Sequence, residues 1–181
     1  MERGDVMSPT LLSTNDKITI KKWIKLVKKK KFKSSQESYS DAQKRLNFPY
    51  PEIGCGAHRI VFDLNNGYVL KVAVSKKGIK DNKIEAKVYH SVNPSLRKHF
   101  APVIDHGRGW IIMEKFDRLF EMNEANFELC KKTLDKFSKE GITPHDIISK
   151  RDPNKINRSN LRFTKEGQLV IIDYGKFEIK E

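Results

Sequence analysis

The chain has 181 residues, 38% of them hydrophobic, a mean hydropathy of −0.62 and a formal net charge of +13. This length suits one domain, or one domain with a tail, and no apolar run approaches the roughly 18 residues of a membrane span. The N-terminus lacks the apolar stretch of a signal peptide, and Cys55 and Cys130 supply neither a metal-ligand spacing nor a disulfide framework. We therefore expect a reduced, cytoplasmic protein, whose basic charge favours an anionic partner such as nucleic acid, a nucleotide or an acidic protein surface.

The first predicted helix covers residues 18–32 and is both amphipathic and strongly basic. Its apolar positions recur at helical spacing: Ile20, Trp23, Ile24 and Val27. The lysines from Lys21 to Lys33 either form a solvated face over this packed stripe, or attract nucleic acid or an acidic protein, or dock on a membrane surface. Residues 33–47 form a linker or a second short helix.

Two glycines, Gly54 and Gly56, precede a predicted hairpin with strands at 60–64 and 68–74. A glycine-rich hairpin can lay backbone N–H groups over phosphates. Lys71 stands in the middle of the second strand, where burial is costly unless an anionic partner lies near. The alternative is a lysine on an edge strand whose ammonium group reaches water.

Several further elements follow in chain order. We expect a basic connection over residues 75–83, a helix over 82–92, a strand pair at 101–105 and 109–114, and a helix over 123–140. Glu85 lies on the helix expected over residues 82–92. Its position alone predicts that it is a surface acid paired with a nearby lysine. Cys130 falls at the inward spacing of the helix expected over 123–140, which predicts a small core residue rather than a reactive thiol.

The last predicted hairpin, at 160–163 and 168–172, ends in a short aliphatic run followed by Asp173, Tyr174 and Gly175. Glycine there allows the backbone to turn sharply. Alone, this segment predicts a buried strand and a turn. It predicts a functional site only in combination with partners elsewhere in the chain.

The order of these signals resembles the protein-kinase superfamily, in particular the small bacterial and phage kinase-like proteins, over about residues 53–177. The resemblance implies an α+β fold, in which an antiparallel N-lobe sheet with one packed helix joins a minimal helical C-lobe that ends in a β-hairpin. It divides the chain into a basic extension, 1–47, and a minimal kinase-like domain, 48–181. Only six residues follow Gly175, so the activation segment and the helices that hold peptide substrates are expected to be absent.

The resemblance also implies roles for individual residues, with ATP and Mg²⁺ as cofactors. The loop over the nucleotide is matched by Gly54, Gly56, Arg59 and Val61. Lys71 matches the lysine that binds the phosphates, and Glu85 matches the glutamate that pairs with it. Glu114 matches the hinge beside the adenine, and the metal ligands are matched by Asn160 and Asp173. Arg59 replaces the third glycine of the pattern and could itself reach a phosphate.

The position of the catalytic aspartate has more than one candidate. The family places it five residues before the metal-binding asparagine, where this chain has Lys155. The segment that ends in His145-Asp146 resembles the catalytic loop instead, with an insertion of about nine residues before Asn160. Asp146, Asp152 and no aspartate at all therefore stay open as answers, and Asp146 is preferred.

Three functions follow from these patterns. The first is an ATP-dependent phosphotransferase of the Ser/Thr protein-kinase type, in which Lys71, Asp146 and Asp173 are catalytic. The second is a pseudokinase adaptor that binds nucleotide or nothing. The third is a nucleic-acid-binding protein on a kinase-like scaffold, which acts through the lysine-rich helix.

Overall fold

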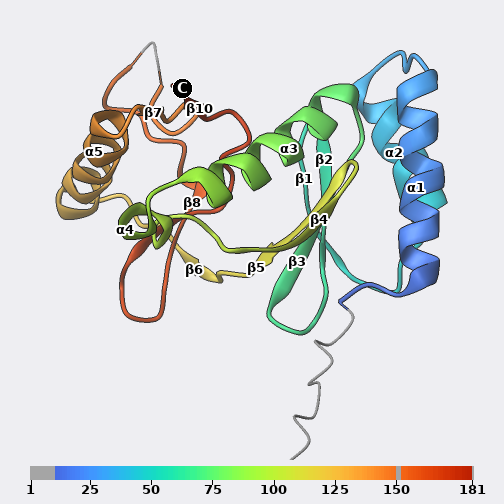
Figure 1. Cartoon of the computed structure of the whole chain (residues 1–181), viewed down its shortest axis with the longest axis horizontal. Coiled ribbons are helices and arrows are strands. Elements are labelled where there is room, and N and C mark those ends of the chain that lie inside the picture. The colour runs from blue at the N-terminus through green and yellow to red at the C-terminus, as the bar shows by residue number, and fades with distance from the viewer. Residues whose placement is uncertain (1–10, 150–151, 181) are drawn as a thin grey trace, which may run out of the picture.

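The structure is a computed structural model that describes residues 11–149 and 152–180. It is an α+β fold (Figure 1). The helices are α1 (Thr14–Lys29), α2 (Ser35–Leu46), α3 (Lys76–Ser91), α4 (Pro94–Arg97), α5 (Glu124–Lys139) and the 3₁₀ turn η1 (Arg158–Asn160). The strands are β1 (Glu52–Cys55), β2 (Arg59–Asp63), β3 (Tyr68–Ala73), β4 (Val103–Gly107), β5 (Trp110–Glu114), β6 (Arg118–Leu119), β7 (Ile142–Thr143), β8 (Leu161–Phe163), β9 (Leu169–Ile171) and β10 (Glu178–Ile179).

The main sheet has the strand order β1-β2-β3-β5-β4, and every neighbouring pair is antiparallel. Strand β3 lies in the middle, where Lys71 is opposite Val61 of β2 and Ile111 of β5. The alternative of an edge-strand lysine is therefore wrong, because both edges of β3 are hydrogen-bonded. Lys71 is buried on the face of the sheet that α3 covers.

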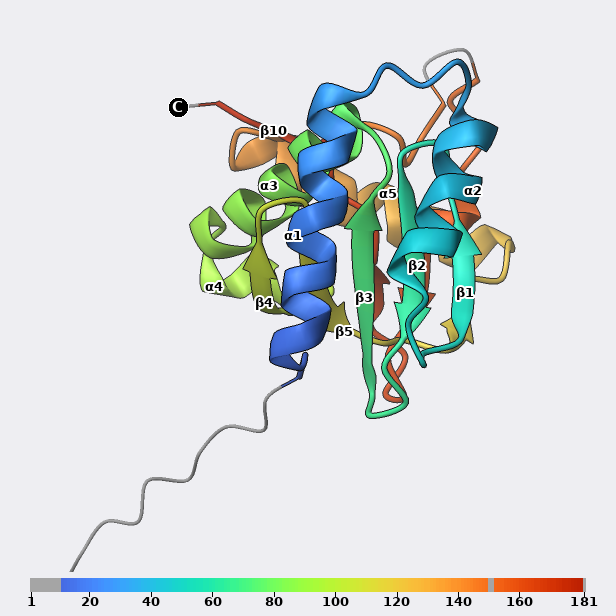
Figure 2. The ribbon, with the colours of Figure 1, turned by 90° about the vertical axis from the view of Figure 1, so that its right-hand side faces the viewer.

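Helices α1 and α2 cover the opposite face of this sheet (Figures 1 and 2). The predicted stripe of α1 is buried against the sheet, and the Trp23 indole Nε1 donates a hydrogen bond to the Ala73 carbonyl at 2.8 Å. The helix begins at Thr14, earlier than expected, because Ser13 and Asp16 form a capping box. Lysines such as Lys21 and Lys25 lie exposed on its outer side.

Helix α3 begins at Lys76, so the expected basic connection over residues 75–83 is wrong. The Ser75 side chain caps the helix by accepting a hydrogen bond from the Gly78 amide at 3.1 Å. Gly78 allows the first turn of α3 to approach the residue before β2 closely, because a Cβ there would lie 2.0 Å from the His58 carbonyl oxygen. The helix therefore starts two turns before the apolar periodicity that the sequence displays.

The C-terminal half packs α5 and the β8–β9 hairpin around a second core (Figure 1). Cys130 is fully buried in this core, as its spacing predicts, and burial raises the pKa of its thiol to about 12. Strand β6 pairs with β8, and β10 pairs with β7. The domain boundary at residue 47 stays a prediction. Over the described ranges, no helix is both long and apolar enough to cross a membrane.

Candidate functional site

Lys71 and Glu85 form a buried ion pair between β3 and α3. The Lys71 ammonium lies 3.1 Å from Oε1 of Glu85 and also donates to the Ile172 carbonyl at 2.5 Å. Glu85 has no exposed surface, so it is not the surface acid that its helix position alone suggested. Glu85 also accepts the backbone N–H of Tyr174 at 3.1 Å. One carboxylate thus connects the sheet, α3 and the segment after β9.

Arg59 adds a second cation to this pair. Its Nη1 atom lies 2.7 Å from Glu85 Oε2, and its Nη2 atom lies 2.6 Å from Asp173 Oδ1. Nη1 also donates to Asn82 on α3 at 3.1 Å. The guanidinium group is therefore turned inward and held by carboxylates, whereas the sequence suggested that it could reach a phosphate. We call Arg59, Lys71, Glu85 and Asp173 the ionic quartet.

The quartet is electrically balanced, with two cations and two carboxylates. Burial alone would raise the pKa of the Asp173 carboxyl, but the charges of Arg59 and Lys71 outweigh it and hold that pKa well below its usual range. Burial lowers the pKa of Lys71, and Arg59 adds to this effect while Glu85 opposes it. The opposing charges are what allow Arg59, Lys71 and Glu85 to be buried, whereas the Asp173 side chain stays partly exposed at the edge of the cluster.

The segment that follows β9, from Asp173 to Gly175, is held in place by close packing. The Tyr174 ring is fully buried, and its hydroxyl donates to the Ala101 carbonyl at 2.8 Å. A Cβ at position 175 would lie 2.7 Å from Cβ of Asp81, so only glycine permits this approach to α3. The same segment thus directs the Asp173 carboxylate towards Arg59 and packs against the helix that carries Glu85.

Asp146 and Asn160 are neighbours in space, although they are far apart in the chain. The Asn160 amide Nδ2 donates to the Asp146 carbonyl at 3.1 Å. The segment between them folds back on itself, because the Asn157 amide donates to the Ile147 carbonyl at 2.8 Å and Ile148 bridges to Ile156. The described residues on the two sides of positions 150 and 151 are therefore paired, and they bring Asn160 back to Asp146.

Asp146 itself has a left-handed backbone, with φ of 69°. Its carboxylate lies 2.6 Å from the Lys176 ammonium, in a contact that is exposed on both sides. Lys176 comes shortly after Asp173, so this ion pair connects the loop that bears Asp146 to the end of the last hairpin.

A cleft of about 740 Å³ brings most of the predicted residues together. Its lining includes Gly54, Gly56, Arg59, Val61, Lys71, Glu114, Asp146, Asn160 and Asp173. Glu85 lies behind this lining and reaches it through Lys71 and Arg59. We call this space the interlobe cleft, because the main sheet forms one wall and the C-terminal half forms the other.

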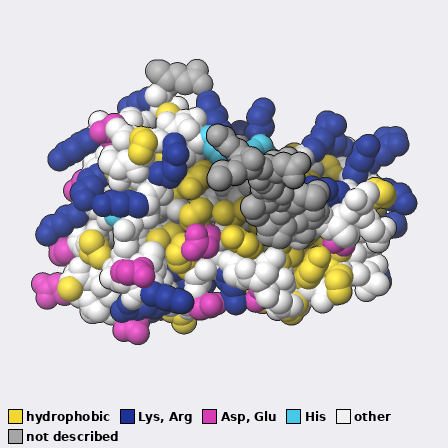
Figure 3. Space-filling model, turned by 60° about the horizontal axis from the view of Figure 1, so that its bottom comes forward, with side chains coloured by type: hydrophobic (Ala, Val, Ile, Leu, Met, Phe, Trp, Pro, Cys, Tyr) yellow, Lys and Arg dark blue, Asp and Glu magenta, His cyan; other side chains and the backbone are white. Residues whose placement is uncertain are grey.

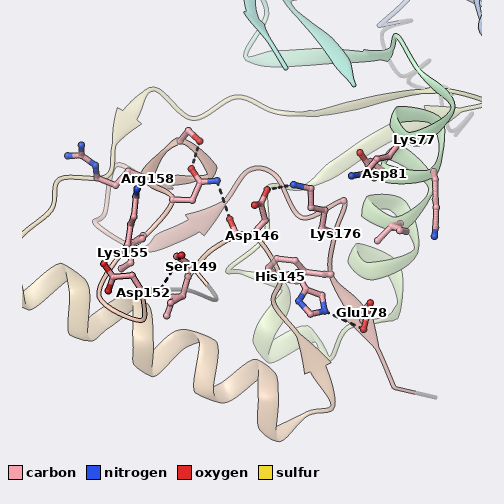
Figure 4. A pocket seen from close by; sticks show the side chains of 18 residues that line it. Lys77, Asp81, His145, Asp146, Ser149, Asp152, Lys155, Arg158, Lys176 and Glu178 are labelled. Atoms are coloured by element: carbon pink, nitrogen blue, oxygen red, sulfur yellow. Dashed lines mark hydrogen bonds and ion pairs between the residues drawn. The ribbon is translucent and has the colours of Figure 1, made fainter. Parts of the chain in front are cut away.

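A second hollow of about 1500 Å³ adjoins the interlobe cleft (Figure 4). Asp81, Asp146, Asn157, Ser159 and Lys176 line both spaces. The other two positions that the sequence raised, Asp152 and Lys155, line only this second hollow. Among the described residues, Asp146 is thus the one of the three that borders the cleft containing Lys71 and Asp173.

Sequence reasoning missed two residues of this site. Asp81 is a buried carboxyl where the two spaces meet, and burial raises its pKa. Its position, one helical turn before Glu85, could have signalled that it lies on the same side of α3. Lys176 follows Gly175 directly and carried no signal, since its contact with Asp146 depends on the path of the inserted segment.

Comparisons with known proteins agree with this architecture. No family model matches the sequence, and no curated protein matches it. Three solved structures of WbdD, a bifunctional kinase-methyltransferase, are similar in fold. The medium-resolution structure has a TM-score of 0.51 and 19% identity, over 69% of this chain and 31% of that chain.

The structure of WbdD with the kinase inhibitor LY294002 gives a TM-score of 0.53 and 18% identity, over 75% of this chain and 34% of that chain. The 2.2 Å structure gives 0.55 and 18%, over 74% and 34%. The chain therefore spans about a third of the length of these neighbours. At this level of identity the likeness extends to the fold, and this fold is similar to that of a protein with kinase activity.

Proposed function

We propose that this protein binds ATP with Mg²⁺ in the interlobe cleft and transfers its terminal phosphoryl group. The observation that carries the proposal is the buried Lys71–Glu85 ion pair, at 3.1 Å, on the same cleft as Asp173, Asn160 and Asp146. Burying a carboxylate and a lysine amine together at a cleft wall costs desolvation free energy, so a gain in stability does not by itself explain the pair. It is expected where that amine must meet phosphates.

The cleft has suitable surfaces for the two ends of a nucleotide. Val61, Val69 and Met113 line it from the sheet and offer an apolar slot for a base. A side chain at Gly54 or Gly56 would make only ordinary contacts within the chain, with nearest atoms at 3.9 and 4.0 Å. The protein's own packing therefore does not require glycine at these positions, and a close approach of phosphates to the backbone gives a reason for it.

The donor set also fits Mg²⁺. This ion is commonly bound through one or two carboxylates together with phosphate oxygens. Asp173 supplies a carboxylate and Asn160 an amide oxygen, whereas no group of three or more His, Cys, Asp or Glu side chains in the described ranges could hold a metal. Metal affinity should therefore depend on the nucleotide. Bound Mg²⁺ would neutralise charge that develops on the transferred group.

The chain's own residues then have distinct tasks. Lys71 orients the phosphates, and Glu85 keeps its amine in position. Arg59 holds the Asp173 carboxylate through a contact with its Oδ1 atom, which a bound metal ion would have to displace or share. Asp146 accepts the proton of the acceptor hydroxyl. Asn160 holds Asp146 in position by donating a hydrogen bond to the backbone carbonyl of Asp146.

The test is transfer of radiolabelled phosphate from ATP, with and without Mg²⁺, together with thermal shift on Mg-ATP. Wild type should transfer only with Mg²⁺, and Asp173→Ala should abolish both transfer and the Mg²⁺-dependent part of the thermal shift. Asp146→Asn should lower transfer by roughly 100-fold or more while it keeps the shift. The matched control is Asp152→Asn, which should retain transfer.

One observation favours a second function, nucleotide binding without turnover. Both carboxylates that would act in transfer are already paired, Asp146 with Lys176 and Asp173 with Arg59, each at 2.6 Å. A pseudokinase would shift in melting temperature with ATP but label nothing, including itself. If neither a shift nor labelling occurs, both nucleotide functions are excluded.

A further inference from the structure

A groove of about 820 Å³ lies on the far side of α3 from the ionic quartet. Its basic and imidazole side chains are Lys76, Lys80, Lys83, Lys87 and His90 from α3 and His106 and Arg108 from the β4–β5 hairpin. The described residues that line it include no aspartate or glutamate. We call this space the basic groove.

The lysines form one stripe along the helix. From Lys76 they recur after four, three and four residues, which is the spacing of a single helix face. At 100° per residue this face lies opposite Glu85. The stripe from Lys76 to Lys87 is about 16 Å long, the axial length of about five phosphates in one strand of nucleic acid. Neighbouring like charges on a helix destabilise it, so an external polyanion would relieve this repulsion.

The hairpin forms the other wall of the groove and extends the basic surface towards α1. Arg108 lies at its turn, beside Gly109, where a Cβ would lie 2.4 Å from Cδ1 of Ile24 on α1. Figure 2 shows this turn between α1 and α3. Lys21 of α1 lies one helical turn from Ile24, on the same side. Figure 3 shows lysine and arginine side chains projecting along one long edge of the molecule.

We propose that the basic groove binds the phosphodiester backbone of nucleic acid. Protein partners generally dock on aromatic and aliphatic anchors at the centre of an interface, but the only larger apolar side chain in the described lining is Ile79. A bilayer surface would touch only the rims of a concave site, whereas a strand can lie along it. Lysines attract phosphates as point charges without reading sequence, so binding should be independent of sequence and steeply dependent on salt.

The test is fluorescence anisotropy of a labelled 20-nucleotide single-stranded DNA with the full chain, from 50 to 200 mM NaCl. Five phosphate contacts, from Lys76, Lys80, Lys83 and Arg108 of the groove and from Lys21 of α1, predict a slope of log affinity against log salt of about −3.5. This slope corresponds to a loss of affinity of about 130-fold over this range. The triple variant Lys80→Gln, Lys83→Gln, Arg108→Gln should reduce the slope by about 2. A changed base composition should leave the affinity of wild type unchanged.

Two triple variants with the same loss of charge serve as controls. Lys132→Gln, Lys136→Gln, Lys139→Gln on α5 should keep the wild-type slope. The variant Lys21→Gln, Lys25→Gln, Lys29→Gln on α1 should reduce the slope by only about 0.7, because of these three residues Lys21 alone lies near the groove.

Equal losses in all three triple variants would overturn the proposal, because net charge would then explain the binding. It would also be overturned if the α1 variant alone lost binding, or if wild type bound vesicles with phosphatidylserine but not the oligonucleotide. Because the groove is separate from the interlobe cleft, these outcomes are independent of phosphoryl transfer.

Discussion

Helix α3 separates two groups of cations that the protein treats in opposite ways. On its inner face, Glu85 and Asp173 balance Arg59 and Lys71 at distances of 2.6 to 3.1 Å, and Glu85 has no exposed surface. On its outer face, the lysines of the basic groove are exposed, and no carboxylate among the described residues lines the groove. The same helix therefore borders a balanced, largely buried cluster on one face and an exposed row of lysines on the other.

The difference follows from the cost of burying charge. A buried cation without a counter-ion is strongly unfavourable. The buried cations Arg59 and Lys71 must therefore be paired with carboxylates of the protein itself. Exposed lysines are solvated and need no internal partner. Charge that the fold must bury and balance indicates a positioned site, whereas exposed basic side chains can attract an external anion.

The largest expected effect comes from breaking the balance on the inner face. Glu85→Ala leaves Arg59 and Lys71 buried without their shared carboxylate and should destabilise the fold by about 3–5 kcal/mol. Urea denaturation measures this change. Glu128→Ala, which removes an exposed acid in a 3.5 Å ion pair with Lys131 on α5, should cost under about 0.5 kcal/mol. A similar small cost for both variants would mean that the quartet contributes no more than a surface ion pair.

The close contact of the inner face with the sheet should be the next most sensitive feature. Gly78→Ala would place a Cβ 2.0 Å from the His58 carbonyl oxygen, which accepts the Val74 amide at 2.8 Å. We expect a loss of about 1–3 kcal/mol from overpacking, measured by urea denaturation. Ala86→Gly, further along α3, should cost about 1 kcal/mol through helix propensity and lost packing. A stabilised Gly78→Ala would contradict the geometry of this contact.

His99 provides a third case, a buried base without any acid. Its Nδ1 donates to the Leu169 carbonyl at 3.1 Å, and its buried Nε2 has no hydrogen-bond partner within the part of the chain that the structure describes. Burial lowers the pKa of His99, so the folded state binds fewer protons than the unfolded state below the ordinary histidine pKa of about 6.5. Stability should therefore decrease as pH falls from 7 to 5.

His99 should contribute part of this decrease, because its imidazole gains a proton more readily in the unfolded state than in the folded state. Urea denaturation at pH 7 and pH 5 measures it, with His99→Gln as the variant that removes the titration. The exposed His90→Gln should retain the wild-type decrease. Burial also lowers the pKa of His58, which acts in the same direction but is present in all three proteins. An unchanged decrease in His99→Gln would show that this imidazole does not titrate differently on folding.

The smallest effect is expected on the outer face. Lys83→Gln removes repulsion with Lys87 four residues later and should leave stability unchanged or raise it by about 0.2–0.5 kcal/mol at low salt. Thermal denaturation at 20 and 500 mM NaCl measures this change, which should disappear at the higher salt because exposed charges are screened. A loss well above 0.5 kcal/mol would mean that Lys83 has a structural role and would weaken the contrast between the two faces.

The pattern of the sequence predicted most of the elements that form these faces. The hairpin of β2 and β3, the helix that carries Glu85 and the final β8–β9 hairpin occur where periodicity and turn residues placed them. The first turns of α3 were missed, because lysines and Gly78 conceal the helix and only the approach to His58 explains that glycine. The apolar stripe of α1 predicted that this helix packs on the core, but it did not indicate that the partner is a face of the main sheet.

The candidate site was predictable as a set of residues, but not as an arrangement. The order of Lys71, Glu85 and Asp173 suggested their proximity through resemblance alone. The sequence suggested that Arg59 could reach a phosphate, but it did not indicate that its guanidinium group contacts the carboxylates of Glu85 and Asp173. The choice between Asp146 and Asp152 could not be made from spacing, because an insertion hides which residue returns to Asn160.

The sequence by itself determined where strands and helices form and which side chains carry charge, because propensity, periodicity and capping act over a few neighbouring residues. Only the tertiary structure decided which charges meet. The ion pair of residues 71 and 85, the contact of 59 with 173 and the return of the inserted segment to 160 depend on distances across the fold. Those distances are set by how the sheet, α3 and the last hairpin pack, and no local pattern in the chain encodes them.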